Sequence, residues 1–142
     1  DLALVLDIHH HWCREGEYIE PTDDRFKRVI DSWRGTRPAI HYSVSREDLL
    51  SLHSKTHRPD FQTLTEQGHK KGKLRAHSDM MWNNAVNDWA LGFLDYADIM
   101  VESKFKNLAS IDLHKYYEGK NDELLENNVR QSKIRQFETA IG

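Results

Sequence analysis

The chain has 142 residues, of which 38% are hydrophobic, so it has the size of one ordinary domain with a modest core. Its formal net charge of -3 excludes a small module that holds DNA mainly through overall positive charge. Its single cysteine, Cys13, excludes an internal disulfide framework, and no apolar run reaches the roughly 20 residues that span a bilayer. We therefore expect an intracellular protein, cytoplasmic and soluble, in a reducing compartment.

The chain opens with an apolar run from Leu2 to Leu6 that ends directly in Asp7 and three histidines. Because every position in the run is apolar, it predicts a parallel strand covered on both faces. A natural domain seldom begins with such a strand at its first residue, so we expect a fragment or a truncated chain. The run is too short for a signal peptide, and we expect none.

Between residues 21 and 73 the sequence predicts three helices, one strand and a basic, flexible stretch. Apolar residues recur at helical spacing from Pro21 to Gly35, where the glycine is expected to end the helix. Residues 38–44 form the second predicted strand, and a capping signal at Ser45 begins a short helix. A further short helix within 59–68 and the basic stretch 69–73 complete this region.

The second half of the chain predicts two more strands. Residues 74–79 are expected to form the third strand, and residues 98–102 a fourth, buried one. An amphipathic helix over 86–94 separates the two. From residue 105 onward we expect helix, broken near Gly119 into two segments.

Four strands that alternate with helices predict an α/β fold with parallel strands and right-handed crossovers. A complete eight-unit barrel takes about 250 residues, so about four parallel βα units predict half of a TIM (β/α)8 barrel. We expect a single domain over residues 1–142, with a helical extension at 115–142. A small doubly wound open sheet is the structural alternative.

Metal-binding residue types gather where the predicted strands end. In a parallel barrel these ends converge on one pocket. Asp7 and His10 follow the first strand, and a loop there could aim both at one ion or at adjacent ions. Alternatively, the histidines cap the barrel or bond to other ligands.

The other three strand ends carry similar residues. His41 ends the second strand, although a lone histidine there is more often a core residue. His77 and Asp79 end the third on one face, because alternate strand residues share a face. Glu102 ends the fourth, where a carboxylate is costly unless it is paired with Lys104 or bound to metal. Together the four ends predict a divalent metal site.

Two further groups are candidates for substrate contact. The basic residues within 70–75 could touch phosphates, although a short charge run is more often a solvated loop. Trp12 and Trp82 follow metal-type residues and could line a substrate cleft.

Four motifs, taken together and in their order, resemble the UV damage endonuclease family. They are Leu-Asp-Ile-His-His-His at 6–11, Pro-Ala-Ile-His-Tyr-Ser at 38–43, Ala-His-Ser-Asp at 76–79 and Ile-Met-Val-Glu-Ser-Lys at 99–104. The resemblance covers residues 1 to roughly 110. It implies the C-terminal half of a TIM barrel with a cluster of divalent ions, above all Mn²⁺ and up to three in a complete barrel. Such a DNA repair enzyme incises DNA on the 5′ side of ultraviolet photoproducts.

The resemblance also implies roles for individual residues. Metal-ligand positions, which act in catalysis through the metal, are matched by Asp7, His10, His41, His77 and Glu102. Asp79 is a further candidate ligand or a partner of one, and Lys104 is a candidate catalytic residue as a phosphate contact.

One position departs from the family, because Ala39 stands where some members carry a lysine near the metals. The role of that lysine is therefore unfilled. The family's first four strands are also absent, so the isolated chain should be incomplete. The implied partners are UV-damaged double-stranded DNA and either a missing N-terminal half-barrel or a second copy of this chain.

The implied reaction is phosphodiester hydrolysis by clustered metals, with the distorted lesion drawn from the base stack. Two other functions stay open. A metal-dependent hydrolase or sugar isomerase on the same barrel could use His9 and His11 as a His-x-His pair. A half-barrel that binds DNA or a partner half without catalysis is the non-enzyme alternative.

Overall fold

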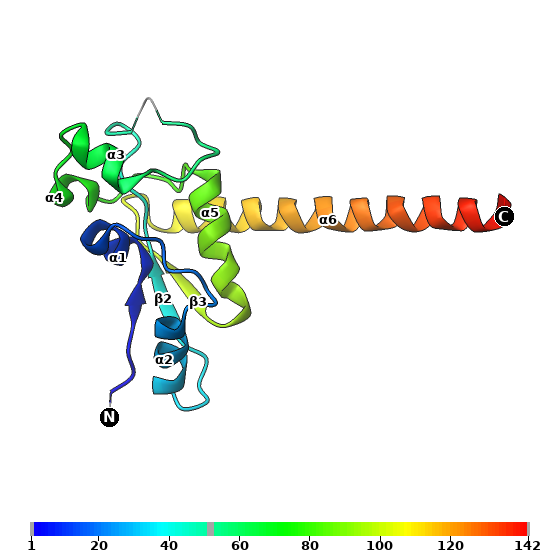
Figure 1. Cartoon of the computed structure of the whole chain (residues 1–142), viewed down its shortest axis with the longest axis horizontal. Coiled ribbons are helices and arrows are strands. Elements are labelled where there is room, and N and C mark those ends of the chain that lie inside the picture. Colours follow the sequence, from blue (N-terminus) through cyan, green and yellow to red (C-terminus); the bar gives the residue numbers. More distant parts are fainter. Residues whose placement is uncertain (1, 51–52, 142) are drawn as a thin grey trace.

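The computed structural model describes residues 2–50 and 53–141, with side chains up to residue 124. The fold is mixed α/β, with a three-stranded parallel sheet in the order β1-β2-β3 (Figure 1). Its strands are β1 (Leu6–Asp7), β2 (Ala39–Tyr42) and β3 (Asp98–Val101). The helices are α1 (Ile8–Glu15), α2 (Asp24–Ser32), α3 (Phe61–Glu66), α4 (Lys71–Leu74), α5 (Asn84–Leu91), the 3-10 turn η1 (Gly92–Asp95) and α6 (Asn107–Ile141).

The strands lie side by side in chain order. Ile40 at the centre of the sheet pairs in register with Leu6 of β1 and Ile99 of β3. Strands in chain order occur both in a barrel wall and in one half of a doubly wound sheet. The pairing confirms the predicted α/β class with parallel strands.

The sheet is covered on one face. Ile40 and Tyr42 are fully buried there, and the Tyr42 hydroxyl donates to Oδ1 of Asn87 in α5 at 2.6 Å. The opposite face carries Ala39 and His41, which are partly exposed, and Met100, which is 54% exposed. Because alternate strand residues point to opposite faces, the hydrophobic core formed by the described residues lies on the side of α5.

The first predicted strand is mostly wrong. Only Leu6 and Asp7 pair with β2, and Leu2 is 87% exposed. The backbone of Leu4 is instead held by side chains at the end of α2, because its N–H donates to Ser32 Oγ and its carbonyl accepts from Trp33 Nε1. These two bonds satisfy the backbone N–H and carbonyl of Leu4 without a neighbouring strand.

The third strand, predicted at 74–79, is also wrong, and the stretch 69–73, predicted to be flexible, is helical from residue 71 onward. Residues 71–74 form α4, and Leu74 is fully buried. His77 makes a single antiparallel bridge with Ser45, and Ser78 N donates to the carbonyl of Val44 at 3.0 Å. Because Leu74 is buried at the end of a helical turn, the segment after it contacts the strand ends through single bonds and does not pair as a strand.

The fourth predicted strand is β3, but it is not buried on both faces. As an edge strand it exposes Asp98 and Met100 on the open side. The amphipathic helix predicted over 86–94 corresponds to α5 and η1, and the predicted helices near 21–35 and 59–68 correspond to α2 and α3. Residues 47–50 form a turn where a helix from Ser45 was expected, and the end of that predicted helix lies outside the described residues.

A helix that the pattern did not predict, α1, follows β1 directly. Asp7 is its N-cap, because the Asp7 carboxylate accepts a hydrogen bond from His10 N at 2.8 Å. Gly16 ends the helix in the left-handed conformation with φ of 74°. The histidine run therefore begins a helix rather than a loop.

The long helix α6 runs without interruption through Gly119, so the predicted break there is wrong. Its first part is attached to α5, since Asp88 accepts from the Tyr116 hydroxyl at 2.7 Å and from Lys120 Nζ at 2.8 Å. These contacts flank Gly119 and support the helix on both sides of it. Beyond them α6 projects away from the sheet (Figure 1). Within the described ranges, no helix has the length and apolar character needed to cross a membrane.

Candidate metal centre

Three predicted ligands meet at one end of the sheet. Asp7, His41 and Glu102 each offer a ligand atom, and these atoms lie within 4.8 Å of one another. Asp7 and His41 are register partners on β1 and β2. Met100 of β3 pairs with His41, and Glu102 lies two residues further along on the same open face. The three adjacent strands thus carry the cluster together.

Backbone hydrogen bonds place the two acidic members. Glu102 N donates to the Tyr42 carbonyl at 2.8 Å, which extends the β2–β3 pairing by one residue beyond the strand. Asp7 is held by its bond to His10 N at the start of α1. The positions of both carboxylates are therefore set by the same backbone that forms the sheet and α1.

The carboxylate of Glu102 lies between two imidazoles. Its Oε1 contacts Nδ1 of His41, and its Oε2 lies 3.4 Å from Nε2 of His77. All three side chains are partly exposed. His77 thus joins the cluster through Glu102, although it comes from an irregular segment and not from a strand.

Three other predicted residues lie outside the cluster. His10 is exposed, and only its backbone N–H contacts Asp7. Asp79 is exposed; the hydrogen bond to Asp48 raises the pKa of Arg46, and the charge of Asp79 adds a smaller effect in the same direction. Lys104 donates its backbone N–H to Ser78, and within the part of the chain that the structure describes no ion pair joins it to Glu102.

A cavity of about 580 Å³ lies beside the residues that directly follow His77. Residues of three loops line it, all of which follow the strand ends or the His77 segment: Arg46, Glu47, Asp48, Ser78, Asp79, Met80 and Phe105. Asp79 therefore faces this cavity.

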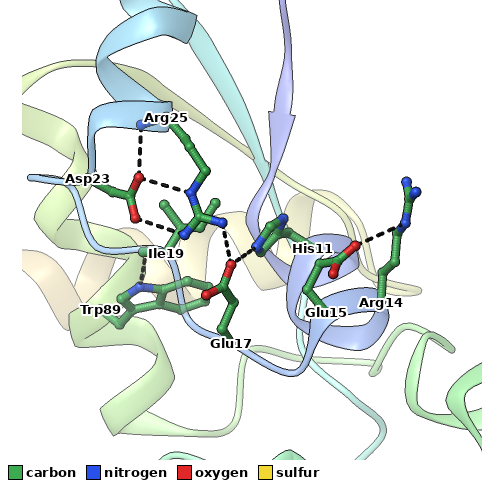
Figure 2. A network of polar contacts seen from close by, with 8 residues as sticks. All are labelled: His11, Arg14, Glu15, Glu17, Ile19, Asp23, Arg25 and Trp89. Carbon is green, nitrogen blue, oxygen red and sulfur yellow. Dashed lines mark hydrogen bonds and ion pairs between the residues drawn. The ribbon is translucent and has the colours of Figure 1, made fainter.

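The remaining histidines of α1 have separate partners. His11 Nε2 lies 2.8 Å from Oε1 of Glu17, which Arg25 also contacts (Figure 2). His9 is 5% exposed and lies inside the core, where burial lowers its pKa to about 3. Positions i and i+2 of a helix do not share a face, so the predicted His-x-His pair does not converge.

Trp12 and Trp82 are core residues and do not line an open cleft. Both side chains are buried. Trp12 packs against Tyr18 and Phe61, with ring centroids 5.6 and 5.5 Å apart, and Trp82 Nε1 donates to the Ser45 carbonyl at 2.8 Å. The basic residues of 70–75 are exposed around α4.

The donor set fits a divalent transition metal. Such ions favour imidazole and carboxylate ligands, which this cluster combines. Two donors bound to one ion at about 2.1 Å lie about 3–4 Å apart. The observed spacing within 4.8 Å needs only a small side-chain adjustment to reach that range.

Comparison with known protein families, curated proteins and solved structures finds no match for this chain. The arrangement of Asp7, His41 and Glu102 is therefore interpreted from its own geometry.

Proposed function

We propose that this chain is the metal-binding C-terminal half of a UV damage endonuclease-like enzyme, which incises DNA on the 5′ side of ultraviolet photoproducts. The observation that carries the proposal is the convergence of Asp7, His41 and Glu102 from three adjacent parallel strands. The order of the four sequence motifs supports the choice of DNA as the substrate.

A half-barrel architecture is part of this proposal. The strands follow one another in chain order, and the helices leave one face of the sheet open. In a barrel that face is the interior, where side chains of the missing strands would cover Ala39 and Met100. The missing strands would come from an N-terminal half-barrel or from a second copy of this chain.

Within the site, Asp7, His41 and Glu102 would hold the first ion, which is expected to be Mn²⁺. His77 lies at the second oxygen of Glu102 and would hold the same ion or a neighbouring one. A bound divalent ion supplies charge to neutralise the scissile phosphate and lowers the pKa of bound water. The chain's own contribution is to orient the carboxylates and imidazoles through the sheet and α1.

Local positive charge would hold the DNA, since the net charge of the chain is -3. Lys104 and Lys106 are exposed directly after Glu102, which makes them the nearest candidates for phosphate contacts. A photoproduct weakens base pairing and so lowers the cost of drawing the lesion from the stack.

The test is to incubate the purified chain with Mn²⁺ and an ultraviolet-irradiated duplex, and to measure bound metal and strand incision together. An undamaged duplex and the Glu102→Gln variant are the controls. Damage-specific nicking that the variant lacks would support the proposal. Absence of both Mn²⁺ binding and nicking would overturn it.

If the chain binds Mn²⁺ but does not nick DNA, a second experiment adds an N-terminal half-barrel of the endonuclease family in trans. Nicking that appears only in the mixture would support the half-enzyme. If the mixture stays inactive on DNA but turns over small phosphoesters or sugars, a different barrel enzyme is indicated.

A further inference from the structure

His9 is a buried polar side chain that the metal cluster does not use. Its Nδ1 lies 2.9 Å from Oγ of Ser43, and its Nε2 lies 3.2 Å from Oγ of Ser45. Cys13 Sγ lies 3.6 Å from the same Nε2. Both ring nitrogens therefore have hydroxyl partners, as a buried imidazole requires.

The hydrogen bonds define the tautomer. Ser45 Oγ donates its only proton to the Leu74 carbonyl at 2.7 Å. It must therefore accept from His9, so Nε2 carries the ring proton. Nδ1 is then the acceptor for the Ser43 hydroxyl, and the Cys13 sulfur can only accept.

This chain of hydrogen bonds joins the segments that carry the cluster. His9 lies two residues after Asp7, and Ser43 lies two residues after His41. Ser45 forms the bridge with His77. The imidazole thus connects α1, the loop after β2 and the segment that brings His77 to Glu102.

We propose that His9, as the neutral Nε2–H tautomer, is a positioning residue that sets the spacing of Asp7, His41 and His77 through Ser43 and Ser45. The inference rests on the proposed metal centre. His9 does not touch the cluster, and it acts by fixing the loop 43–45 against α1.

The test compares three replacements of His9. His9→Phe keeps the ring volume and loses both hydrogen bonds. His9→Asn places an acceptor near the Nδ1 position and restores only the Ser43 bond. His9→Gln places a donor near the Nε2 position and restores only the Ser45 bond.

Mn²⁺ affinity, measured by electron paramagnetic resonance of the free ion, is the first readout. We expect His9→Phe to weaken binding about 10-fold, the lower end of the range for residues behind metal ligands, with the amide variants between it and the wild type. Cys13→Ala is the matched control, because it opens the same region of the core but leaves both serine bonds intact. If the wild type binds Mn²⁺ and His9→Phe and Cys13→Ala bind it equally well, the positioning role of His9 is overturned and the metal centre is not.

A metal-free readout tests the proposal independently of the metal centre. Ring resonances of His41 and His77 should shift in His9→Phe and remain in place in Cys13→Ala, and proton–nitrogen spectra should assign the His9 ring proton to Nε2. Unmoved resonances, or a proton on Nδ1, would overturn the inference. Failure of the wild type to bind Mn²⁺ would overturn the metal centre and leave this readout to decide on His9.

Discussion

Glu102 places its carboxylate oxygen Oε2 3.4 Å from Nε2 of His77, while its other oxygen contacts His41. One acidic side chain therefore holds two imidazoles that come from different kinds of backbone, a strand and an irregular segment. Loss of its charge should disturb both histidines together.

Glu102→Gln is expected to weaken Mn²⁺ binding by more than about 10-fold, because the amide is a poor ligand and its NH₂ group repels the ion. Isothermal titration calorimetry measures the change. Glu118→Gln is the matched control, since Glu118 pairs with His114 within α6 at 3.0 Å and neither residue belongs to the cluster. Equal affinity in the two variants would contradict the site.

Of the three predicted histidine ligands, His41 and His10 should differ in their effect on Mn²⁺ binding. His41→Ala removes a member of the cluster, whereas His10 is exposed and contacts Asp7 only through its backbone. We expect His41→Ala to reduce Mn²⁺ affinity at least about 10-fold more than His10→Ala does. Similar losses in both variants would place the His10 imidazole in the site after all.

Substitutions at two glycines should distinguish the cost of backbone strain from the cost of steric overlap. Gly16 and Gly35 have φ of 74° and 87°, but a Cβ at Gly16 would lie 2.8 Å from Cδ1 of Phe61, whereas one at Gly35 meets no atom within 4 Å. Gly35→Ala should lower the free energy of unfolding by about 1 kcal/mol. Gly16→Ala should cost at least about 1 kcal/mol more, because Phe61 packs on Trp12. Urea unfolding measures both values, and equal losses would show that Phe61 moves aside.

The free energy of unfolding at acidic pH should depend on Arg25. Hydrogen bonds from Arg25 lower the pKa of Asp23 to about 2 and also lower the pKa of Glu17 (Figure 2). A carboxyl whose pKa is depressed in the folded state stabilises the protein above its ordinary pKa, and this contribution is lost as the pH falls through the folded value. The contribution of Asp23 should therefore be complete above the ordinary Asp pKa of 3.8 and disappear towards pH 2, and that of Glu17 should be complete above the ordinary Glu pKa of 4.5.

Arg25→Gln should raise both carboxyl pKa values and flatten the stability curve across that range. Carboxyl NMR titration and thermal unfolding between pH 2 and pH 5 would measure these changes. Arg28→Gln on the same helix is the control. An unchanged Asp23 titration in Arg25→Gln would contradict the contact.

The candidate site could be predicted in part from the sequence, because the strand ends of a parallel sheet share one edge. That rule brought Asp7, His41 and Glu102 together. The rule does not explain the position of His77, because His77 does not end a strand. Its position depends on the helix α4, which ends at the buried Leu74, and on a bridge to Ser45. The rule also offered no role for His9, since Ser43 and Ser45 approach it only in the folded chain.

The other differences between the predicted and the observed secondary structure also have local causes. The apolar run at the start of the chain resembled a buried strand, but β2 is in register only with Leu6 and Asp7, and α2 binds the backbone of Leu4. The acidic residue that ends β1 also caps α1, so one side chain has two roles that a pattern of apolar residues does not separate. The glycine at 119 suggested a break, but contacts to Asp88 hold the helix on both sides of it.

The backbone pairing that spaces Asp7, His41 and Glu102 belongs entirely to the three strands and their immediate ends. The long segment between β2 and β3 adds only His77 to the cluster, and its outer part around α3 lies away from the sheet (Figure 1). Insertions or deletions near Gly68 should therefore leave the spacing of Asp7, His41 and Glu102 unchanged, so the length of this segment can vary independently of the geometry of the candidate site.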